Sequence, residues 1–347
     1  MALTAAAKWG ISDYEPLAGL MDEAQTERAN RLCPTPRAVI AALFPYFAGT
    51  VEGNISLYAR GEDYHRVVMR ELEKACEELR RSFDGFTFAP CVDSSPLPER
   101  EAALSAGLGI LGDNGLIISP PYGSFVFIGC ILTDMPIPAE KKAYAGCLHC
   151  GLCQKHCPTG ALCKGRVDIK KCLSDVTQRK GELTEEEIAI IKKEGTAWGC
   201  DVCQKVCPLN KDTKISPITH FTASESYPQL ANLEYDQIHS LGSREFLRRY
   251  DGRAFTWRGK AVLERNLEMF PVSDSLDIAA FIIFGDVELT VKGSEELLKK
   301  VPEFDYIVTP EAKSIPIAYE MSRQSGKKYF VARKKAKLYM QNPVTVD

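Results

Sequence analysis

The sequence lacks the features of a membrane or secreted protein. No apolar run approaches the roughly 18 residues that a membrane-spanning helix needs, and the N-terminus carries no signal-peptide pattern. A large charge of one sign is also missing, because 43 lysines and arginines face 46 aspartates and glutamates, for a net charge of −3. A nucleic-acid partner would therefore have to bind a local basic patch. We expect a cytoplasmic protein without a membrane partner.

Cysteine, in contrast, is abundant, with 13 in the chain. In a reducing compartment such a number indicates metal binding rather than disulfides. Residues 147–158 read C-x2-C-x2-C-x3-C-P, which is the run of bacterial-type iron–sulfur proteins. Zinc sites usually take cysteines in pairs. After a gap, Cys172 precedes a second set, which ends in another Cys-Pro at Cys207 and Pro208.

These runs predict two 4Fe–4S clusters. In two-cluster modules of this kind, the last cysteine of each run ligates the other cluster. One cluster is therefore assigned to Cys147, Cys150, Cys153 and Cys207. The other is assigned to Cys157, Cys172, Cys200 and Cys203. Because each set joins distant segments, cluster binding should also stabilise the fold.

A mixed pattern of strands and helices precedes the clusters. Strands are expected at residues 38–44, 86–92, 116–119 and 125–132. Helical spacing of apolar residues predicts a helix that Asp63 caps and Gly85 ends, and a shorter helix at 99–106. Residues 1–35 are expected to be helical or irregular. The mixture predicts a catalytic domain of the α/β or α+β class.

Asp93 stands where the strand predicted at 86–92 meets a loop, a common position for a catalytic residue. The alternative is that Asp93 caps the helix that begins near Pro98, and its position alone does not separate the two. Residues 107–112 formally fit the GxGxxG pattern. They follow a helix rather than a strand, so we reject dinucleotide binding.

Several ordered motifs resemble those of the epoxyqueuosine reductase family over about residues 35–270, a span consistent with one large domain. The motifs are residues 58–65, 92–100, 106–114, 123–124, 133–134 and 199–210, together with Gly129. The resemblance implies a cobalamin-dependent enzyme with two clusters, in a fold shared with reductive dehalogenases. It also implies removal of the epoxide oxygen of epoxyqueuosine at the wobble position of tRNA. Ferredoxin or flavodoxin would supply electrons, and the enzyme would act as a monomer.

The same resemblance assigns roles to individual residues. Asp93 matches the catalytic aspartate, which would donate a proton to the oxygen. That role needs a neutral carboxylic acid, and burial against the corrin ring would provide it. Positions expected around the cobalamin are Tyr64, His65, Gly107, Gly109, Gly112, Asn114, Gly123 and Ser124.

The sequence also departs from the family pattern. Asp113 stands where the family usually has lysine, Ser95 replaces the commoner alanine, and the helical-repeat extension of longer members is missing. These departures keep two alternatives open, a cobalamin-dependent relative that reduces another small substrate and a two-cluster electron-transfer protein. A basic set is interpreted as contacts for the tRNA backbone, against the alternative of a solvated helix face. Its members are Arg166, Lys170, Lys171, Arg179, Lys180, Arg244, Arg248, Arg249, Arg253, Arg258, Lys260 and Arg265.

The expected organisation is therefore an α+β or α/β cobalamin-binding reductase domain with an embedded ferredoxin-like module and a partial α/β piece at the C-terminus. The boundaries are 1–140 for the catalytic domain, 141–215 for the cluster module, 216–272 for a basic helical segment that packs on the catalytic domain, and 273–347 for the last piece. The last piece contains a βαβ pattern with strands near 305–308 and 328–331. It resembles the first half of a type I phosphoribosyltransferase. The acidic motif that binds phosphoribosyl pyrophosphate is missing, so we expect no transferase activity.

Overall fold

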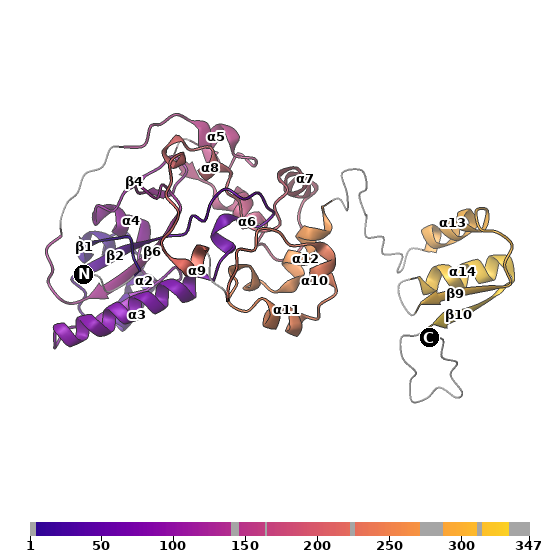
Figure 1. The fold of residues 1–347 in the computed structure, drawn as a ribbon, viewed down its shortest axis with the longest axis horizontal. Helices are drawn as coiled ribbons and strands as arrows, with labels where there is room; N and C mark the ends of the chain where they lie inside the picture. Colours follow the sequence, from indigo (N-terminus) through magenta and orange to yellow (C-terminus); the bar gives the residue numbers. More distant parts are fainter. Residues whose placement is uncertain are drawn as a thin grey trace. The chain divides into compact units, whose positions relative to one another are not determined.

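The computed structural model describes residues 5–139, 146–163, 165–222, 226–270, 287–310 and 314–332. Its contacts divide the chain into two compact units, residues 1–277 and residues 278–347, which are described separately (Figure 1). The three segments predicted before residue 273 thus lie within a single compact unit. Within the described residues, no helix combines the length and the apolar character required to cross a membrane.

The first unit is built on an antiparallel sheet of four strands in the order β1-β2-β6-β3. The strands are β1 (Lys8–Asp13), β2 (Ala38–Pro45), β3 (Phe88–Cys91) and β6 (Val126–Thr133). Every residue of β2 is buried, as its continuous apolar run predicted. Alternate side chains point to opposite faces of a strand. Ile40 and Phe44 accordingly enter one core, and Val39 and Leu43 enter another.

Helices cover both faces of this sheet (Figure 1). On one face lies α3 (Tyr64–Ser82), which Asp63 caps as predicted and which packs Val68 and Leu72 into the first core. The second core contains residues from α1 (Tyr14–Ala18), α2 (Glu23–Leu32) and α4 (Glu99–Ser105). This arrangement makes the first unit an α+β fold, one of the two predicted classes.

The prediction of helical or irregular structure for residues 1–35 is confirmed for α1 and α2 but was wrong for β1, which is an edge strand. Its two buried positions are Gly10 and Ser12, so the strand has no apolar alternation. Glycine is required at position 10 because a Cβ there would lie only 2.3 Å from the carbonyl oxygen of Ala106. The residues between Gly109 and Gly112 form β4 (Ile110–Leu111), which pairs with β5 (Ile117–Ile118).

The cysteine-rich segment consists of short elements joined by loops. These are α5 (Leu152–His156), β7 (Leu162–Cys163), β8 (Arg166–Val167), η2 (Ile169–Lys171), α6 (Leu173–Val176), α7 (Glu185–Glu194), α8 (Val202–Lys205) and η3 (Pro208–Asn210). The capping box of Thr184 and Glu187 begins α7, and Gly195 ends it in the left-handed conformation. Most cysteines of this segment thus lie in loops, and the positions of these loops depend on the surrounding contacts.

A third core joins the end of the first unit to the segment before α3. It contains Ile55 and Trp198 together with residues of the later helices. The elements of this region are η1 (Leu57–Ala59), α9 (Thr219–Thr222), α10 (Tyr235–His239), α11 (Ser243–Arg249), η4 (Ala254–Thr256) and α12 (Lys260–Glu268). The residues around Leu57 therefore lie between the sheet and the helices that follow the cysteines.

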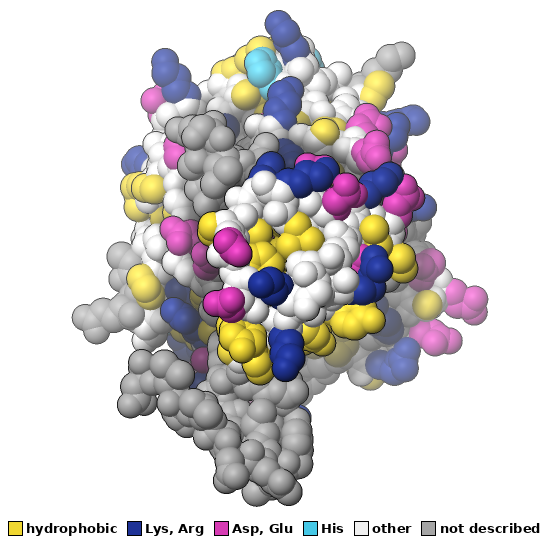
Figure 2. All heavy atoms as spheres, turned by 90° about the vertical axis from the view of Figure 1, so that its right-hand side faces the viewer, with side chains coloured by type: hydrophobic (Ala, Val, Ile, Leu, Met, Phe, Trp, Pro, Cys, Tyr) yellow, Lys and Arg dark blue, Asp and Glu magenta, His cyan; other side chains and the backbone are white. Residues whose placement is uncertain are grey.

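The second unit contains α13 (Val287–Leu298), β9 (Tyr306–Pro310), α14 (Ile315–Ser325) and β10 (Lys328–Ala332). The two strands are parallel, as the predicted βαβ pattern requires. Tyr306, Val308 and Phe330 are exposed on one face of this sheet, and Figure 2 shows hydrophobic side chains at the surface of this end of the molecule. The resemblance to a phosphoribosyltransferase stays a prediction.

Close packing of α3 on the sheet yields a first prediction. A Cβ at Gly129 of β6 would lie 2.6 Å from Val68 Cγ1 and 3.0 Å from Leu72 Cδ1. Gly129→Ala should therefore lower the free energy of unfolding by about 1–3 kcal/mol, the usual cost of overpacking. Gly242→Ala is the control, since no atom lies within 4 Å of the added Cβ, and it should cost below about 1 kcal/mol. Anaerobic denaturant unfolding measures both, and equal losses would contradict this packing.

Candidate active site

The eight predicted cluster ligands fall into two spatial groups. Cys147, Cys150, Cys153 and Cys207 line one small cavity. Cys157, Cys172, Cys200 and Cys203 line a second, much larger cavity. Each group matches one of the two ligand sets assigned from spacing. Each also brings together segments more than 40 residues apart in sequence, so a metal bound there would link distant parts of the chain. The grouping supports the ligand assignment.

Electrostatic coupling between the thiols lies mostly within each group, although Cys153 of the first group also raises the pKa of Cys203. Burial raises the pKa of Cys207, and the neighbouring Cys147 and Cys150 raise it further. Burial raises the pKa of Cys200 to about 12, with added contributions from Cys172 and Cys157. Without a cation these thiols therefore stay protonated, and metal binding would release their protons.

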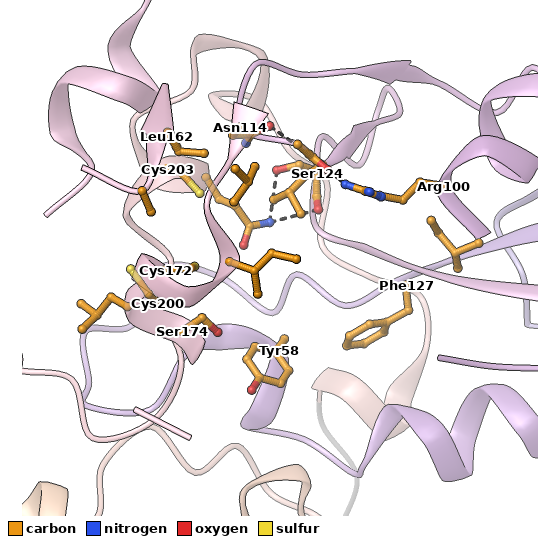
Figure 3. Close-up of a pocket in the computed structure, with 18 of the residues that line it drawn as sticks. Tyr58, Arg100, Asn114, Ser124, Phe127, Leu162, Cys172, Ser174, Cys200 and Cys203 are labelled. Carbon is orange, nitrogen blue, oxygen red and sulfur yellow. Dashed lines mark hydrogen bonds between the residues drawn. The ribbon is translucent and has the colours of Figure 1, made fainter. Parts of the chain in front are cut away.

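The large cavity has a volume of about 1180 Å³, above the range of about 300–1,000 Å³ usual for ligand pockets. In Figure 3, Cys172, Cys200 and Cys203 lie on one side of this cavity, and Arg100 and Phe127 lie on the other. Asp93 and His65 also line it. One cavity thus joins the second group of cysteines to the predicted catalytic aspartate.

Asp93 is held by two side chains from the start of α3. His65 Nε2 lies 3.1 Å from Asp93 Oδ2, and His65 Nδ1 lies 2.8 Å from Asp63 Oδ1. The hydroxyl group of Tyr64 also donates a hydrogen bond to Asp93. Tyr64 stacks on His65 with ring centres 4.0 Å apart, and on Phe127 at 4.3 Å. The imidazole is therefore fixed between two carboxylates and one aromatic ring.

These contacts favour the ionised form of Asp93 in the structure without a cofactor. The hydrogen bond from His65 lowers the pKa of Asp93, and this effect exceeds the opposing effect of burial. Burial lowers the pKa of His65, but the hydrogen bonds to Asp63 and Asp93 outweigh it and raise this pKa to about 9. The proton of the pair therefore lies on His65. The expectation of a neutral Asp93 depends on burial against the corrin ring and stays a prediction.

Glu99 lines the large cavity and has a carboxyl group with a raised pKa, although it was not predicted from the sequence as a site residue. Burial raises the pKa of Glu99 to about 7, although Ser95 Oγ donates a hydrogen bond to its Oε1 at 2.8 Å. The backbone N–H of Asp93 also bonds to this carboxyl group. Glu99 thus closes the loop that carries Asp93, whose φ of 52° lies in the left-handed region.

Four of the eight residues predicted around the cobalamin line the large cavity. These are Tyr64, His65, Asn114 and Ser124. The side-chain amide nitrogen Nδ2 of Asn114 is buried and has no hydrogen-bond partner in the part of the chain that the structure describes. Such an unpaired group costs about 1–3 kcal/mol, which a ligand that accepts its hydrogen bond would recover.

The other four predicted positions are glycines with backbone roles. Gly107 has φ 64° just after α4, and Gly109 approaches the carbonyl oxygen of Ile118, which a Cβ would meet at 2.5 Å. Gly123 is left-handed and packs against Asn210. Gly112 lines the small cavity instead, beside the first cysteine group. None of these four glycines lines the large cavity, and each is required by a turn or a close approach of the backbone, so their place around a cobalamin stays a prediction.

A buried polar network attaches the second group of cysteines to the sheet. Gln204 Nε2 donates to the carbonyl oxygen of Ser124 at 3.0 Å and to the hydroxyl oxygens of Ser124 and Tyr46 at 3.1 Å. Asn210 Nδ2 donates to Ser124 Oγ and to the carbonyl oxygen of Gln204, both at 2.8 Å. The backbone N–H of Ser124 donates to Asn210 Oδ1. Gln204 follows Cys203 directly, so the network fixes that wall of the cavity.

Asp113, the departure from the family lysine, has a partner in the cysteine-rich segment. His149 Nδ1 lies 3.0 Å from Asp113 Oδ1. His149 stands between Cys147 and Cys150 with φ 48°. The exchange therefore creates a direct side-chain contact between the glycine-rich turn and the loop of the first cysteine group.

The predicted basic patch is smaller than the sequence indicated. Arg253 is buried and donates to the carbonyl oxygens of Arg60, Gly61 and Pro228. Arg265 donates to other carbonyl oxygens in the same way. Arg179 and Lys260 pair with carboxylates. These four are therefore structural, whereas the exposed members are Arg166, Lys170, Lys171, Lys180, Arg244, Arg248 and Arg249.

Several cavity residues gave no separate signal in the sequence. Glu99 and Arg100 lie in a predicted helix, where charged side chains usually face solvent. Phe127 belongs to a strand that is otherwise a core element. The sequence contains one indication that these residues line the cavity. Each lies close in sequence to a strand or turn that carries a predicted site residue.

Two family models match separate parts of the first unit. Residues 146–210 match "4Fe-4S double cluster binding domain". Residues 27–94 match "Epoxyqueuosine reductase QueG, DUF1730". The first match confirms the prediction of two 4Fe–4S clusters, and the second covers the segment from α2 to Asp93.

Comparison with individual proteins extends the similarity beyond these two segments. The chain is 31% identical to the epoxyqueuosine reductase of Aliivibrio fischeri over 253 residues, which are 70% of this chain and 67% of that enzyme. The chain belongs to the epoxyqueuosine reductase family. It is 37% identical over 217 residues to the enzyme of Lactococcus garvieae, with 62% of this chain and 60% of that enzyme covered.

A solved structure of an epoxyqueuosine reductase with an epoxyqueuosine-modified tRNA stem loop shares the fold. Its TM-score is 0.65 at 25% identity, with 84% of this chain and 81% of that chain covered. The chain spans about 60% of the length of the Lactococcus relative it matches. Family membership and the double-cluster domain are therefore established, whereas the activity of the whole protein is a matter for proposal.

The two cysteine groups predict which iron is lost on mutation. Cys203→Ser should remove the cluster beside the large cavity, and Cys153→Ser should remove the other, so each variant should keep about half of the iron. Cys163→Ser is the control, because Cys163 is exposed and belongs to neither group. Iron and sulfide analysis with EPR of the reduced protein measures the outcome. Full iron content in Cys203→Ser would contradict the assignment.

Proposed function

We propose that this protein reduces epoxyqueuosine to queuosine at the wobble position of tRNA, with two 4Fe–4S clusters and cobalamin as cofactors. The observation that carries the proposal is the large cavity, which places the second cysteine group and the Asp93–His65 pair on walls of one space. Membership of the family supports it. A relative was solved with an epoxyqueuosine-modified tRNA stem loop, which supports the same substrate here.

The cavity fits a large, flat cofactor in size and in lining. Its volume of about 1180 Å³ exceeds the needs of a small substrate alone. Aromatic rings of Tyr58, Tyr64 and Phe127 provide flat apolar walls, and the unpaired Nδ2 of Asn114 supplies a hydrogen-bond donor. A cobalamin held there would supply a reduced cobalt centre that reacts with the epoxide carbon. The protein's contribution is then position and electrostatics.

The Asp93–His65 pair holds a proton for the reaction. Removal of an epoxide oxygen as water consumes two electrons and two protons, so the site must protonate an oxygen that becomes negatively charged. His65 carries a proton at neutral pH, and its Nε2 is bonded to Asp93. We propose that Asp93 Oδ2 takes up this proton from His65 Nε2 and passes it to the substrate oxygen, and that solvent supplies the second proton of the water formed.

The clusters differ in exposure in a way that suits electron entry and exit. Cys150 of the first group is exposed, whereas Cys200 and Cys203 of the second group line the cavity. A ferredoxin or flavodoxin would deliver electrons at the exposed cluster. The second cluster would pass them into the cavity. This order gives each cluster one role in a protein that acts as a monomer.

A second candidate is a relative that reduces another small substrate with the same cofactors. The observation that favours it is Asp113, which replaces a family cation and binds His149 instead. The basic patch that could bind tRNA is also smaller than predicted, because four of its arginines and lysines already pair with other groups of the protein. The same cavity and proton pair would serve such a substrate.

Turnover of epoxyqueuosine-containing tRNA tests the proposal. The cluster-loaded protein should bind cob(II)alamin stoichiometrically under anaerobic conditions, with a shifted optical and EPR spectrum, and should form queuosine. Asp93→Asn should lower kcat by about 10²–10⁴-fold, the usual contribution of a positioned proton donor. Cobalamin binding without tRNA turnover would favour the second candidate. Clusters without cobalamin binding would leave an electron-transfer protein.

The raised pKa of His65 predicts the alkaline limb of the pH profile. Because the proton on His65 is lost as pH rises through about 9, kcat/KM should fall above that pH. Asp63→Asn removes a carboxylate that raises this pKa while it keeps an N-cap side chain for α3, so the limb should move to lower pH. The control is Asp22→Asn at the N-cap of α2, which should leave the profile unchanged. A limb that does not move would contradict a proton held on His65.

A further inference from the structure

Trp257 is an exposed aromatic residue on the wall of the large cavity. It follows η4, and 59% of its surface is accessible even though the neighbouring Arg258 covers part of it. Its ring orientation is fixed, because the indole Nε1 donates to Gln178 Oε1 at 3.0 Å. Gln178 Nε2 in turn donates to the hydroxyl oxygen of Tyr58 at 3.2 Å. A flat apolar surface is thus held in place and left open to solvent.

Arg258 lies against one face of this ring. Its Cζ is 3.6 Å from the ring centre of Trp257, which is a close cation–π contact. The Nε of Arg258 is buried, and no described residue gives it a hydrogen-bond partner. Among the described parts of the chain, no hydrogen bond or ion pair of Arg258 is found, unlike Arg253 and Arg265. The guanidinium group is therefore held in position with its donors unused.

We propose that Trp257 and Arg258 form a subsite for the RNA next to the nucleotide that undergoes reaction. One nucleobase stacks on the open face of Trp257, and a phosphate oxygen accepts hydrogen bonds from Arg258. Proteins that bind unpaired RNA stack bases on aromatic rings and arginine planes, and they position the backbone through arginine–phosphate contacts. The inference rests on the proposed tRNA substrate and extends it to a specific contact outside the reacting base.

Two other roles for the indole ring make different predictions. A purely structural role would depend on the Nε1 bond to Gln178, which joins the turn after η4 to the end of α6. Trp257→Phe removes that bond and keeps a ring, whereas Trp257→Leu removes the ring as well. A role in packing against cobalamin would affect binding of that cofactor and leave RNA affinity unchanged.

The test uses the full-length, cluster-loaded protein and a fluorescently labelled anticodon hairpin RNA. Hairpin affinity is measured by anisotropy under anaerobic conditions. Trp257→Leu should weaken binding by about tenfold to a hundredfold, equivalent to about 1.4–2.8 kcal/mol. Trp257→Phe should stay within about threefold of the wild type. The matched control is Trp9→Leu on the edge strand β1, where 43% of the side chain is exposed, and it should bind as the wild type does.

Two further measurements locate the contact. A hairpin with 5-iodouridine beside the wobble position should cross-link to Trp257 on irradiation. Arg258→Gln should reduce the slope of log Kd against log salt by about one, as expected for the loss of one phosphate contact. In turnover, Trp257→Leu should raise KM and leave kcat nearly unchanged, because the ring does not contact the reacting atoms.

The outcomes separate this inference from the proposed function. Normal hairpin affinity in Trp257→Leu, with epoxyqueuosine turnover intact in the wild type, would overturn the subsite alone. Equal weakening in Trp257→Phe and Trp257→Leu would show a structural role and would also overturn it. Weaker cobalamin binding with unchanged hairpin affinity would assign the ring to the cofactor. Failure of the wild type to bind the hairpin would overturn both the subsite and the tRNA substrate.

Discussion

The buried amide of Gln204 is the contact on which the cavity depends. It donates to Ser124 at two oxygens and to Tyr46, and thereby attaches α8, which carries Cys203, to the residues just before β6 and just after β2. Inside the protein each unpaired donor or acceptor would cost about 1–3 kcal/mol, so this network is stable only when all its members meet. The cysteine-rich segment has few apolar contacts of its own, with only Leu173, Val176 and Ile191 in its buried cluster. Polar contacts and bound iron must therefore supply much of its order.

Charge is distributed along the cavity so that one proton is available at neutral pH. Asp93 and Asp63 both hold His65 in the protonated form, and Tyr64 adds a donor to Asp93. Glu99 binds the backbone N–H of Asp93 and has a raised pKa, so it positions the loop without adding a full negative charge near pH 7. A cofactor that covers the exposed half of Asp93 would remove water and raise its pKa. The proton of the pair would then shift from His65 toward Asp93, which would bring it next to a developing oxyanion.

The sequence predicted the features that depend on local spacing. The two ligand groups follow from the short cysteine runs, and β2 follows from eight consecutive buried residues. Features that depend on tertiary contacts were missed. Strand β1 buries a glycine and a serine, so nothing in its composition distinguishes it from a loop. Glu99 and Trp257 belong to the cavity because of how their elements pack. The glycines predicted around the cofactor are explained by tight backbone packing without any ligand, so the sequence alone does not separate the two roles.

The function of an electron-transfer protein does not require the strained backbone and the unpaired polar group that line this cavity. Asp93 has a left-handed backbone, which costs of the order of 1–2 kcal/mol for a residue other than glycine. The amide Nδ2 of Asn114 is buried without a partner. A relay also gains nothing from a cluster that faces an internal space, because its partners bind at the surface. Such costs usually persist at sites where ligands or catalysis depend on them. The cavity therefore argues for an enzyme that brings its substrate to the second cluster.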